Sequence, residues 1–276
     1  RRFSYGIRTL AYNYQAVISL ENLLMAWQEF SAGKKSRNDV QEFGLRLMTN
    51  LITLQRDLAG KTYIHSAYRA IKISDPKPRD IHKASVRDRI VHRALYRKLY
   101  PFFDRRFVCD SYACRLRKGT HRAMDRFRTF ARIASVNNTR TCWVLKCDIR
   151  KFFANIDHAI LMDILGKYIT DTEIISLLRN IIGSFNTQGK IGVGLPLGNL
   201  TSQLFVNIYM NEFDQFMKHN LREKRYIRYA DDFIFLSSDR THLATLIPKI
   251  AVFLRERLRL ELHPDKLFIK TFASGV

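Results

Sequence analysis

No apolar run of about 20 residues, the length that a membrane-spanning helix needs, occurs in this chain of 276 residues. We find no signal peptide either. Acidic residues are few, because 25 Asp and Glu stand against 47 Lys and Arg, and the formal net charge is +22. A charge excess of this size is self-repelling unless a polyanion neutralises it. These absences argue against a membrane-spanning protein and make nucleic acid the expected partner, ahead of an anionic membrane surface.

Cysteine is scarce, and its spacing is not that of a common zinc site. The four cysteines form two pairs, Cys109 with Cys114 and Cys142 with Cys147. Each pair encloses four residues, whereas zinc ligands are usually separated by two. We therefore expect buried free thiols in a reducing cytoplasm.

The chain also lacks an initiating Met and begins Arg1-Arg2, so we expect a piece of a longer product. Its hydrophobic share of 46% is enough for a substantial core, in one large domain or in several subdomains.

The most informative stretch is Tyr226–Leu236, an apolar and aromatic run with two adjacent carboxylates, Asp231 and Asp232, at its centre. The flanking residues predict two short strands joined by a tight turn. Ionised carboxylates in such surroundings destabilise the fold, because they lose water and repel each other. Bound divalent cations remove this free-energy cost. Hard oxygen ligands of this kind suit Mg²⁺. The alternative is an ordinary hairpin turn in which both aspartates face water.

A third carboxylate occurs in a matching setting. Trp143–Ile149 is another β-prone run, and Asp148 stands near its end. Three aspartates at the ends of core strands can hold two metal ions roughly 3.5–4 Å apart, which clamps the attacking and leaving oxygens of phosphoryl transfer. The two stretches together favour metal-assisted phosphoryl transfer.

Two motifs in these stretches resemble the metal-binding motifs of the reverse transcriptase palm: Tyr229-Ala230-Asp231-Asp232 (YADD) and Asp148-x-x-x-Phe152-Phe153. The resemblance implies that two Mg²⁺ ions, or Mn²⁺ in their place, are bound by Asp148, Ile149, Asp231 and Asp232. It also implies that the three aspartates are catalytic.

Two further residues acquire roles from the resemblance alone. Phe153 matches the steric gate, a ring that collides with a ribose 2′-hydroxyl and favours deoxynucleotides; an ordinary core phenylalanine is the alternative. Lys266 lies where related polymerases carry a lysine proposed to protonate the departing pyrophosphate. A surface turn lysine is the alternative there.

Lys77-Pro78-Arg79 and Val86–His92 resemble the fingers motifs of group II intron-like reverse transcriptases. In that family the arginine matching Arg79 lies over the incoming triphosphate, and a guanidinium can hold phosphate oxygens bidentately. Lys77 is assigned to the same nucleotide. The amphipathic helix expected over Ser85–Leu99 has a basic face that we interpret as a face for phosphates. Template and primer contacts are expected from Lys72, Arg87, Arg89, Arg117, Lys118 and Tyr229.

A Gly- and Pro-rich loop, Gly192–Asn199, lies between the two metal motifs and matches the family segment that contacts nucleotide and template. This segment usually reads Gln-Gly-x-x-x-Ser-Pro, but here Leu197 replaces the amide and Gln203 replaces the proline. Both departures resemble the reverse transcriptases of diversity-generating retroelements, which copy a template RNA with frequent errors opposite adenine. The nucleotide-contacting residues implied by the match are Leu197, Gly198, Ser202 and Gln203.

The expected fold is α+β, a right-hand polymerase of fingers and palm whose antiparallel sheet packs on helices, with no thumb in this chain. Residues 4–73 show helical periodicity and form the N-terminal extension, 1–73. The fingers are expected at 74–140 and the palm at 141–276, with part of 160–200 assignable to the fingers. Pro101 is predicted to end the basic helix, and Thr120 to cap the next one.

The sequence therefore predicts an RNA-directed DNA polymerase that adds dNTPs to a primer 3′-hydroxyl. We expect the diversity-generating type, prokaryotic or phage-encoded and cytoplasmic, with an RNA template, a DNA or RNA primer and a basic accessory protein as partners. The alternatives are a defence- or CRISPR-associated reverse transcriptase, an RNA-dependent RNA polymerase, a template-independent polymerase, and a maturase-like RNA-binding scaffold. The three aspartates argue against a scaffold, which has no evident use for clustered carboxylates near a polyanion.

Overall fold

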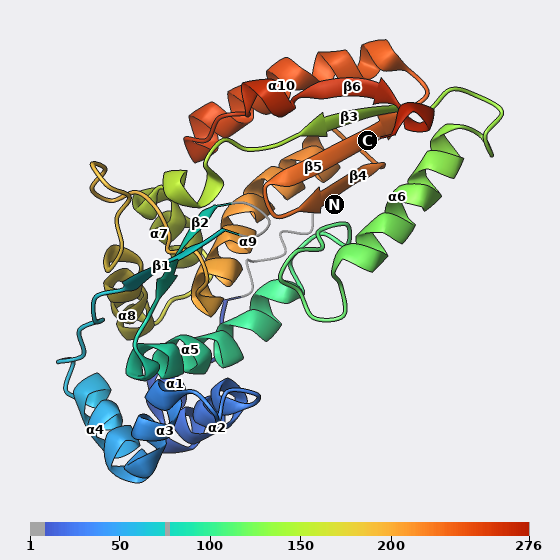
Figure 1. The fold of residues 1–276 in the computed structure, drawn as a ribbon. Helices are drawn as coiled ribbons and strands as arrows, with labels where there is room; N and C mark the ends of the chain where they lie inside the picture. The colour runs from blue at the N-terminus through green and yellow to red at the C-terminus, as the bar shows by residue number, and fades with distance from the viewer. Residues whose placement is uncertain (1–8, 75–77, 276) are drawn as a thin grey trace. The chain divides into compact units, whose positions relative to one another are not determined.

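The structure, a computed structural model, describes residues 9–74 and 78–275 (Figure 1). The chain forms two compact units: unit 1 within Arg1–Arg105 and His158–Phe205, and unit 2 within Arg106–Asp157 and Val206–Val276. This division does not follow the boundaries expected at residues 73 and 140, and the naming of fingers and palm segments stays a prediction. No helix among the described residues is both long and apolar enough to cross a membrane.

Unit 1 is mainly helical. Its helices are α1 (Tyr14–Ile18), α2 (Leu20–Ser31), α3 (Asn38–Leu45), α4 (Leu47–Ala59), α5 (Val86–Asp104), α7 (His158–Gly166) and α8 (Thr172–Gly183). Four of them begin at a side chain that accepts a hydrogen bond from a free backbone N–H, namely Asn13, Ser19, Ser85 and Asp171. Helix α2 packs along α5, where Leu23, Ile90 and Leu95 are fully buried.

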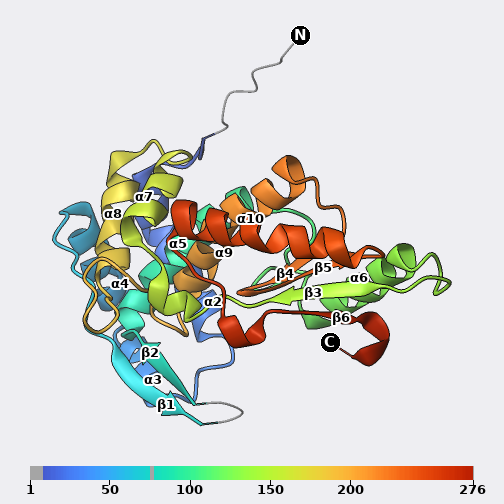
Figure 2. The same cartoon turned by 90° about the horizontal axis from the view of Figure 1, so that it is seen from above.

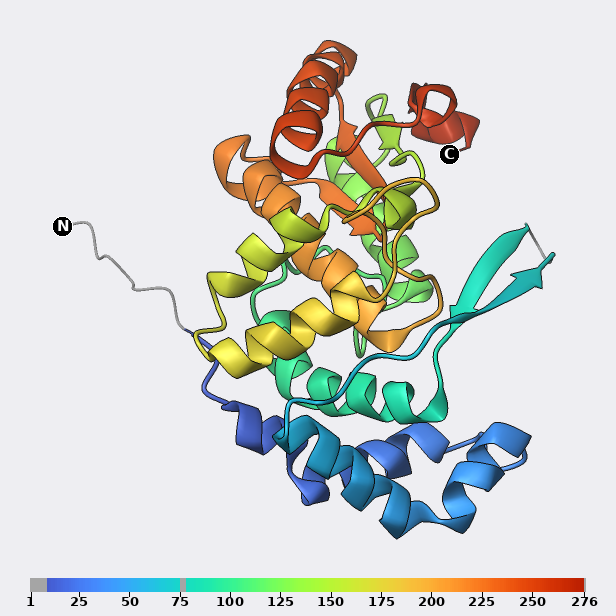
Figure 3. The ribbon, with the colours of Figure 1, turned by 90° about the vertical axis from the view of Figure 1, so that its left-hand side faces the viewer.

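An antiparallel hairpin of β1 (Arg69–Ile73) and β2 (Arg79–Lys83) also belongs to unit 1. The prediction of helix through residue 73 is wrong at this end, because α4 ends at Ala59. The β-branched residues Ile71 and Ile73 flank Lys72 with the two-residue period of a strand. Figure 3 shows the hairpin projecting from the helices of the unit.

Helix α5 continues past the end that Pro101 predicted at Leu99. Proline removes one backbone hydrogen bond and crowds the carbonyl four residues earlier, which ordinarily stops a helix. Here Leu99, Tyr100 and Phe103 are buried, and their packing keeps the last turn helical as far as Asp104.

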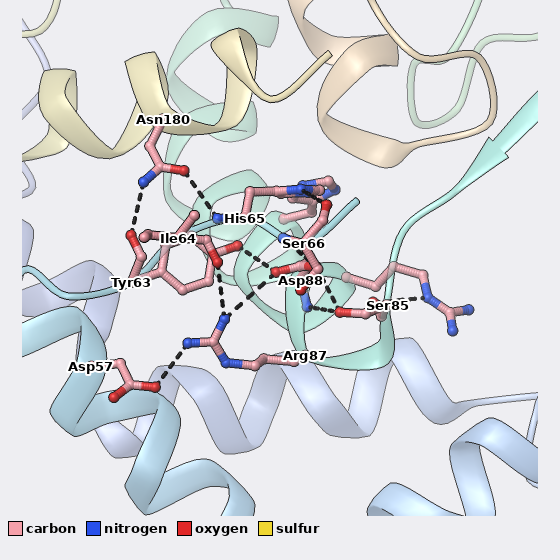
Figure 4. A network of polar contacts seen from close by, with 11 residues as sticks. Asp57, Tyr63, Ile64, His65, Ser66, Ser85, Arg87, Asp88 and Asn180 are labelled. Atoms are coloured by element: carbon pink, nitrogen blue, oxygen red, sulfur yellow. Dashed lines mark hydrogen bonds and ion pairs between the residues drawn. The ribbon is translucent and has the colours of Figure 1, made fainter. Parts of the chain in front are cut away.

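The first turn of α5 is held by the fully buried Asp88 (Figure 4). Its carboxylate accepts hydrogen bonds from the hydroxyls of Ser85 (2.6 Å) and Tyr63 (2.8 Å) and from the backbone N–H of Ser66 (3.2 Å). Burial by itself raises the pKa of Asp88, but these donors and nearby His65 outweigh it and lower the pKa overall. Asp88 is therefore an ionised anchor inside the unit, held by hydrogen bonds from the protein itself.

One turn further along α5, His92 is 1% exposed, and its ring stacks on His65 with 5.1 Å between ring centroids. Burial, with the nearby charges of His65 and Arg89, lowers the pKa of His92 to about 3, while Asp88 opposes the shift. An unfolded histidine has a pKa of about 6.5. Below that pH the unfolded chain takes up a proton that the folded chain does not, so stability present above pH 6.5 is lost as the pH falls toward 3.

We predict that the free energy of unfolding falls by about 1.4 kcal/mol when the pH is lowered from 7.5 to 5.5, because His92 takes up a proton only in the unfolded chain. His92→Gln should remove this part of the pH dependence, and His121→Gln, at an exposed position, should keep it. Urea unfolding at the two pH values measures both. Equal pH dependence in the wild type and His92→Gln would contradict the prediction.

Unit 2 contains a four-stranded antiparallel sheet of order β4-β5-β3-β6. Its strands are β3 (Trp143–Cys147), β4 (Tyr226–Tyr229), β5 (Asp232–Ser237) and β6 (Phe268–Thr271). Its helices are α6 (Thr120–Ala134), α10 (Arg240–Leu258), the short η1 (Phe152–Asn155), η3 (Pro264–Lys266) and η4 (Phe272–Ser274), and the π-helical turn η2 (Phe216–Asn220). Helix α9 (Leu200–Gln215) begins in unit 1 and ends in unit 2. The strands predicted in Trp143–Ile149 and Tyr226–Leu236 are confirmed.

Alternate side chains of the sheet enter two packed layers. Helix α10 packs on β3, β5 and β6, as Figure 2 shows, and α6 packs on β4 and β5. Phe233 lies 4.9 Å from Phe213 of α9 between ring centroids. Leu236 belongs instead to the apolar cluster that contains Phe130 of α6 and Val144. Burial on both faces explains why these strands are almost continuously apolar.

Two local predictions need correction in unit 2. Gly119, with a φ of 101°, is the N-cap of α6, and the Thr120 hydroxyl donates a hydrogen bond to the Tyr229 hydroxyl (3.2 Å) instead. A positive φ suits glycine, which has no side chain to clash. Cys142 and Cys147 are buried as predicted, whereas Cys109 and Cys114 are exposed because they lie in the irregular segment before α6.

Candidate active site

Strand register places two of the predicted aspartates opposite each other. Cys147 pairs with Phe233 in the β3–β5 ladder, so Asp148 and Asp232 are the next opposed residues where the ladder ends. Opposed residues project from the same face of a sheet. Asp231 lies in the turn between β4 and β5, which is formed by Ala230 with a φ of 56°. Asp148 thus meets the adjacent pair Asp231 and Asp232, which lie far from it in the sequence, at one end of the sheet.

These carboxylates interact in a partly dehydrated setting. Burial, with the charges of Asp148 and Asp232, raises the pKa of Asp231 to about 6, although a backbone hydrogen bond and Lys266 act against the shift. Burial and Asp148 also raise the pKa of Asp232. The Lys266 ammonium donates a hydrogen bond to Oδ2 of Asp148 at 2.8 Å, and this contact raises the pKa of Lys266. Lys266 thus compensates part of the negative charge.

The donor set fits a hard divalent cation. Among the residues that the structure describes, no group of three His, Cys, Asp or Glu side chains is gathered tightly enough to coordinate a metal ion. The chemistry nevertheless suits one, because Asp148, Asp231 and Asp232 supply only carboxylate oxygens, and a bound cation would favour the ionised forms of Asp231 and Asp232, whose pKa values are raised. Ile149 is buried and forms a β-bridge with Leu262. Because its side chain is a hydrocarbon, only its backbone carbonyl could serve as a metal ligand.

Arg228, which the sequence analysis missed, supports the turn that carries Asp231 and Asp232. It is fully buried and holds both carboxylate oxygens of Asp214, at 2.8 and 2.7 Å. Its remaining N–H groups donate to Ser111, to Asn207 and to the carbonyl of Ala230 (3.0 Å), inside the turn itself. The available signal was one basic residue, Arg228, within the otherwise apolar and acidic run Tyr226–Leu236.

Unit 2 also contains other residues that the sequence predicted to contact nucleotide, template or primer. Phe153 in η1 is half-buried, and its ring lies edge-on to Phe152 with 5.6 Å between centroids. Tyr229 is 39% exposed. Arg117 is exposed, and Lys118 donates a hydrogen bond to the carbonyl of Cys109. Their assignments to nucleotide, template or primer stay predictions.

Unit 1 holds the two motifs that resemble those of the fingers, at residues 77–79 and 86–92, together with Lys72. Lys72 and Arg79 lie on the hairpin with exposed side chains, and Lys77 lies outside the described residues. The basic face of α5 is partly neutralised by ion pairs inside unit 1, and its assignment to template and primer phosphates stays a prediction. Arg87 pairs with Asp57 and Arg89 with Asp39, because α3 and α4 supply carboxylates beside this helix.

The loop of unit 1 that contains Leu197 is attached to the hairpin. The backbone N–H of His82 donates to the Leu197 carbonyl (3.0 Å), and the Asn199 amide donates to the His82 carbonyl (2.8 Å). Gly198 has a φ of 98°, and a Cβ there would lie 2.7 Å from Cγ2 of Ile81. A glycine is therefore required for this close approach. Ser202 is buried in the first turn of α9, and Gln203 is half-buried.

Comparison with known proteins agrees with this arrangement. Residues 71–272 match the family model of the reverse transcriptase (RNA-dependent DNA polymerase). Protein YkfC of Escherichia coli is 27% identical over 272 residues, which span 83% of this chain and 70% of YkfC. The group II intron-encoded protein LtrA of Lactococcus lactis is 22% identical over 264 residues, 72% of this chain and 43% of LtrA.

Solved structures show the same fold. Apo telomerase from Candida tropicalis, truncated from its C-terminal domain, superimposes with a TM-score of 0.54 at 15% identity, over 81% of this chain and 55% of that one. The mixed helix and antiparallel-sheet architecture is thus the polymerase fold that the sequence predicted. The family match covers most of the chain, and the chain therefore belongs to the reverse transcriptase (RNA-dependent DNA polymerase) family.

Proposed function

We propose that the chain is an RNA-directed DNA polymerase that uses two divalent metal ions. The observation that carries the proposal is the meeting of Asp148, Asp231 and Asp232 at the end of the β3–β5 ladder, where burial and mutual repulsion raise the pKa values of the last two. Such a cluster destabilises the fold unless cations are bound, so a stable structural role does not account for it.

The side chains of the site have separate roles in the proposed reaction. When bound, the two Mg²⁺ ions activate the primer 3′-hydroxyl and neutralise the triphosphate. Asp148 and Asp232 lie opposite each other where two adjacent strands end, and this register sets the spacing of the two carboxylates. Arg228 holds the turn that presents Asp231. Lys266, 2.8 Å from Asp148, carries the proton that we assign to the departing pyrophosphate.

We also propose the nucleotide and strand contacts implied by the family motifs. Arg79 is assigned to the triphosphate, because a guanidinium holds phosphate oxygens bidentately. Phe153 is assigned to the sugar. The net charge of +22 supports salt-sensitive, largely sequence-independent binding of template and primer through their phosphates.

Primer extension tests the proposal. Purified chain with Mg²⁺, an RNA template and an annealed DNA primer should incorporate dNTPs in template order. NTPs should be used poorly, and nothing should be added without a template. Extension with NTPs alone would instead favour an RNA polymerase, and untemplated addition would favour a template-independent enzyme. RNA binding without any extension would favour a maturase-like scaffold.

Leu197 further supports an error-prone enzyme of the diversity-generating type. For an enzyme of this type we also propose a basic accessory protein as partner. An aliphatic side chain where relatives have an amide removes a hydrogen bond available beside the nascent base pair, which weakens geometric checking there.

We predict that Leu197→Gln lowers the frequency of errors opposite template adenine by about fivefold, the worth of one hydrogen bond. Sequencing of the cDNA made on one RNA template measures this. Ile191→Gln, at a 97% exposed position just before this loop, is the control and should leave the spectrum unchanged. An identical spectrum from Leu197→Gln and wild type would count against the subtype.

A further inference from the structure

The segment that leads to Lys266 is attached, within unit 2, to the backbone that follows β3. The backbone N–H of Arg150 donates a hydrogen bond to the carbonyl of Glu261 (2.9 Å), and the backbone N–H of His263 donates to the carbonyl of Asp148 (2.8 Å). Paired hydrogen bonds of this kind form a short antiparallel ladder. The main chain of His263 is therefore held beside the carboxylate site.

From His263 a single helical turn, η3, leads to Lys266. The carbonyl of His263 accepts a hydrogen bond from the backbone N–H of Lys266 (3.3 Å), and Pro264 occupies the first position of the turn, where no N–H is needed. The side chain of His263 is the N-cap, because its Nδ1 accepts from the backbone N–H of Asp265 (3.2 Å). A backbone N–H only donates, so Nδ1 is the acceptor and the neutral ring carries its proton on Nε2.

The capped turn directs Lys266 back to Asp148. The ammonium of Lys266 donates a hydrogen bond to Oδ2 of Asp148 at 2.8 Å, and the carbonyl of the same Asp148 accepts from His263. The Lys266 side chain is 48% exposed, and ordering a long exposed side chain has an unfavourable entropy. Its contact with Asp148 therefore depends on how firmly the turn beneath it is held.

We propose that His263 is a positioning residue, which caps η3 and so keeps the ammonium of Lys266 on Asp148, ready to protonate the departing pyrophosphate. In that step the primer 3′-oxygen, having lost its proton to solvent, bonds to the α-phosphorus of the dNTP. The bond from this phosphorus to the bridging oxygen breaks, and the oxygen keeps the electron pair and takes a proton from Nζ of Lys266. Lys266 then recovers a proton from solvent. His263 touches no reacting atom.

The protonation step rests on the proposed function, whereas the positioning of Lys266 can be measured without catalysis. Acetylation by an N-hydroxysuccinimide ester, followed by mass spectrometry, reports how readily each lysine leaves its partner. His263→Ala should raise the labelling rate of Lys266 about fivefold, the worth of one helix cap. Lys249, exposed on α10, is the internal reference and should react at one rate in both proteins. A chain that extends no primer but shows this change would keep the positioning role while the proposed function failed.

Single-turnover primer extension with two dNTP analogues tests the protonation step. A β,γ-methylene group makes the leaving group more basic than a β,γ-difluoromethylene group does, so departure of the first depends more on a proton donor. His263→Ala should slow the methylene analogue about fivefold and the difluoromethylene analogue by less than about twofold. The KM for each should stay unchanged. Lys266→Met should show the same bias with a larger effect.

Two further variants separate positioning from stability. His263→Asn returns a capping acceptor and should restore the labelling rate and both extension rates to within about twofold of wild type. Asp239→Ala is the matched control, because Asp239 caps α10 by accepting two backbone N–H groups at the end of β5 opposite Asp232. It removes a cap of the same kind and should alter neither the labelling of Lys266 nor either rate.

Equal labelling of Lys266 in wild type and His263→Ala would overturn the proposal. Equal slowing of the two analogues by His263→Ala would overturn it as well, because that pattern indicates a general loosening of the site. A failure of His263→Asn to restore function would show that the imidazole does not act as a cap. If Lys266→Met slowed neither analogue in a chain that extends primers, His263 would be a structural cap alone.

Discussion

Asp232→Asn is expected to lower the rate of dNTP incorporation about a thousandfold, equivalent to about 4 kcal/mol of transition-state stabilisation. The change keeps the shape of the side chain and removes the charge that we assign to metal binding. Stability should not fall, because burial and Asp148 already disfavour the charge at this position. Single-turnover primer extension and a thermal melt together measure the two effects.

Asp265→Asn is the matched control, since Asp265 adjoins Lys266 but is 87% exposed. It should leave the rate within about twofold, because exposed charges in water interact weakly. If Asp232→Asn slowed incorporation no more than Asp265→Asn, the carboxylate would have no part in metal binding. A large drop in melting temperature in Asp232→Asn would point to a structural role instead.

Arg228→Met should cost about 3–5 kcal/mol of stability, the largest loss that we expect from a single substitution in unit 2. Arg228 and Asp214 are both 0% exposed and joined by two hydrogen bonds, so the variant leaves a buried carboxylate without its charged partner, although the Tyr226 hydroxyl still donates to it. The Ala230 carbonyl also loses its donor, which loosens the turn that holds Asp231. Urea unfolding measures the loss.

The double variant Arg228→Met/Asp214→Leu separates charge from packing. It should regain much of the stability lost by Arg228→Met, since replacing a buried ion pair with apolar residues is often nearly neutral. Its polymerase rate should stay low, because the Ala230 carbonyl remains without Arg228. Full activity in the double variant would show that Arg228 does not position the turn.

The sequence alone was enough to predict the central strands of unit 2. Tyr226–Leu236 and Trp143–Ile149 carry β-prone residues on both sides of their aspartates, and such local patterns survive in the fold. The limits of α5 could not be read in this way. Pro101 is a local stop signal, but the burial of Tyr100 and Phe103 overrides it through contacts that no sequence window contains.

Tertiary partners also decided what the basic residues do. Arg87 and Arg89 look like phosphate ligands in the sequence, yet Asp57 and Asp39, from distant helices, meet them in the fold. Arg228, on strand β4, was overlooked for the opposite reason, because its partner Asp214 belongs to helix α9 and nothing near Arg228 in the chain reveals the pairing. Local spacing predicts elements, whereas the pairing of charges depends on topology.

The central claim is that Asp148, Asp231 and Asp232 jointly bind divalent metal ions. Mn²⁺ titration followed by electron paramagnetic resonance, on the full chain with primer–template and dNTP, tests it most directly. Wild-type protein should bind Mn²⁺ at sites that disappear when the three residues are changed together to asparagine. If the triple variant bound as many ions with the same affinity, the metal would be held elsewhere and the account would be wrong.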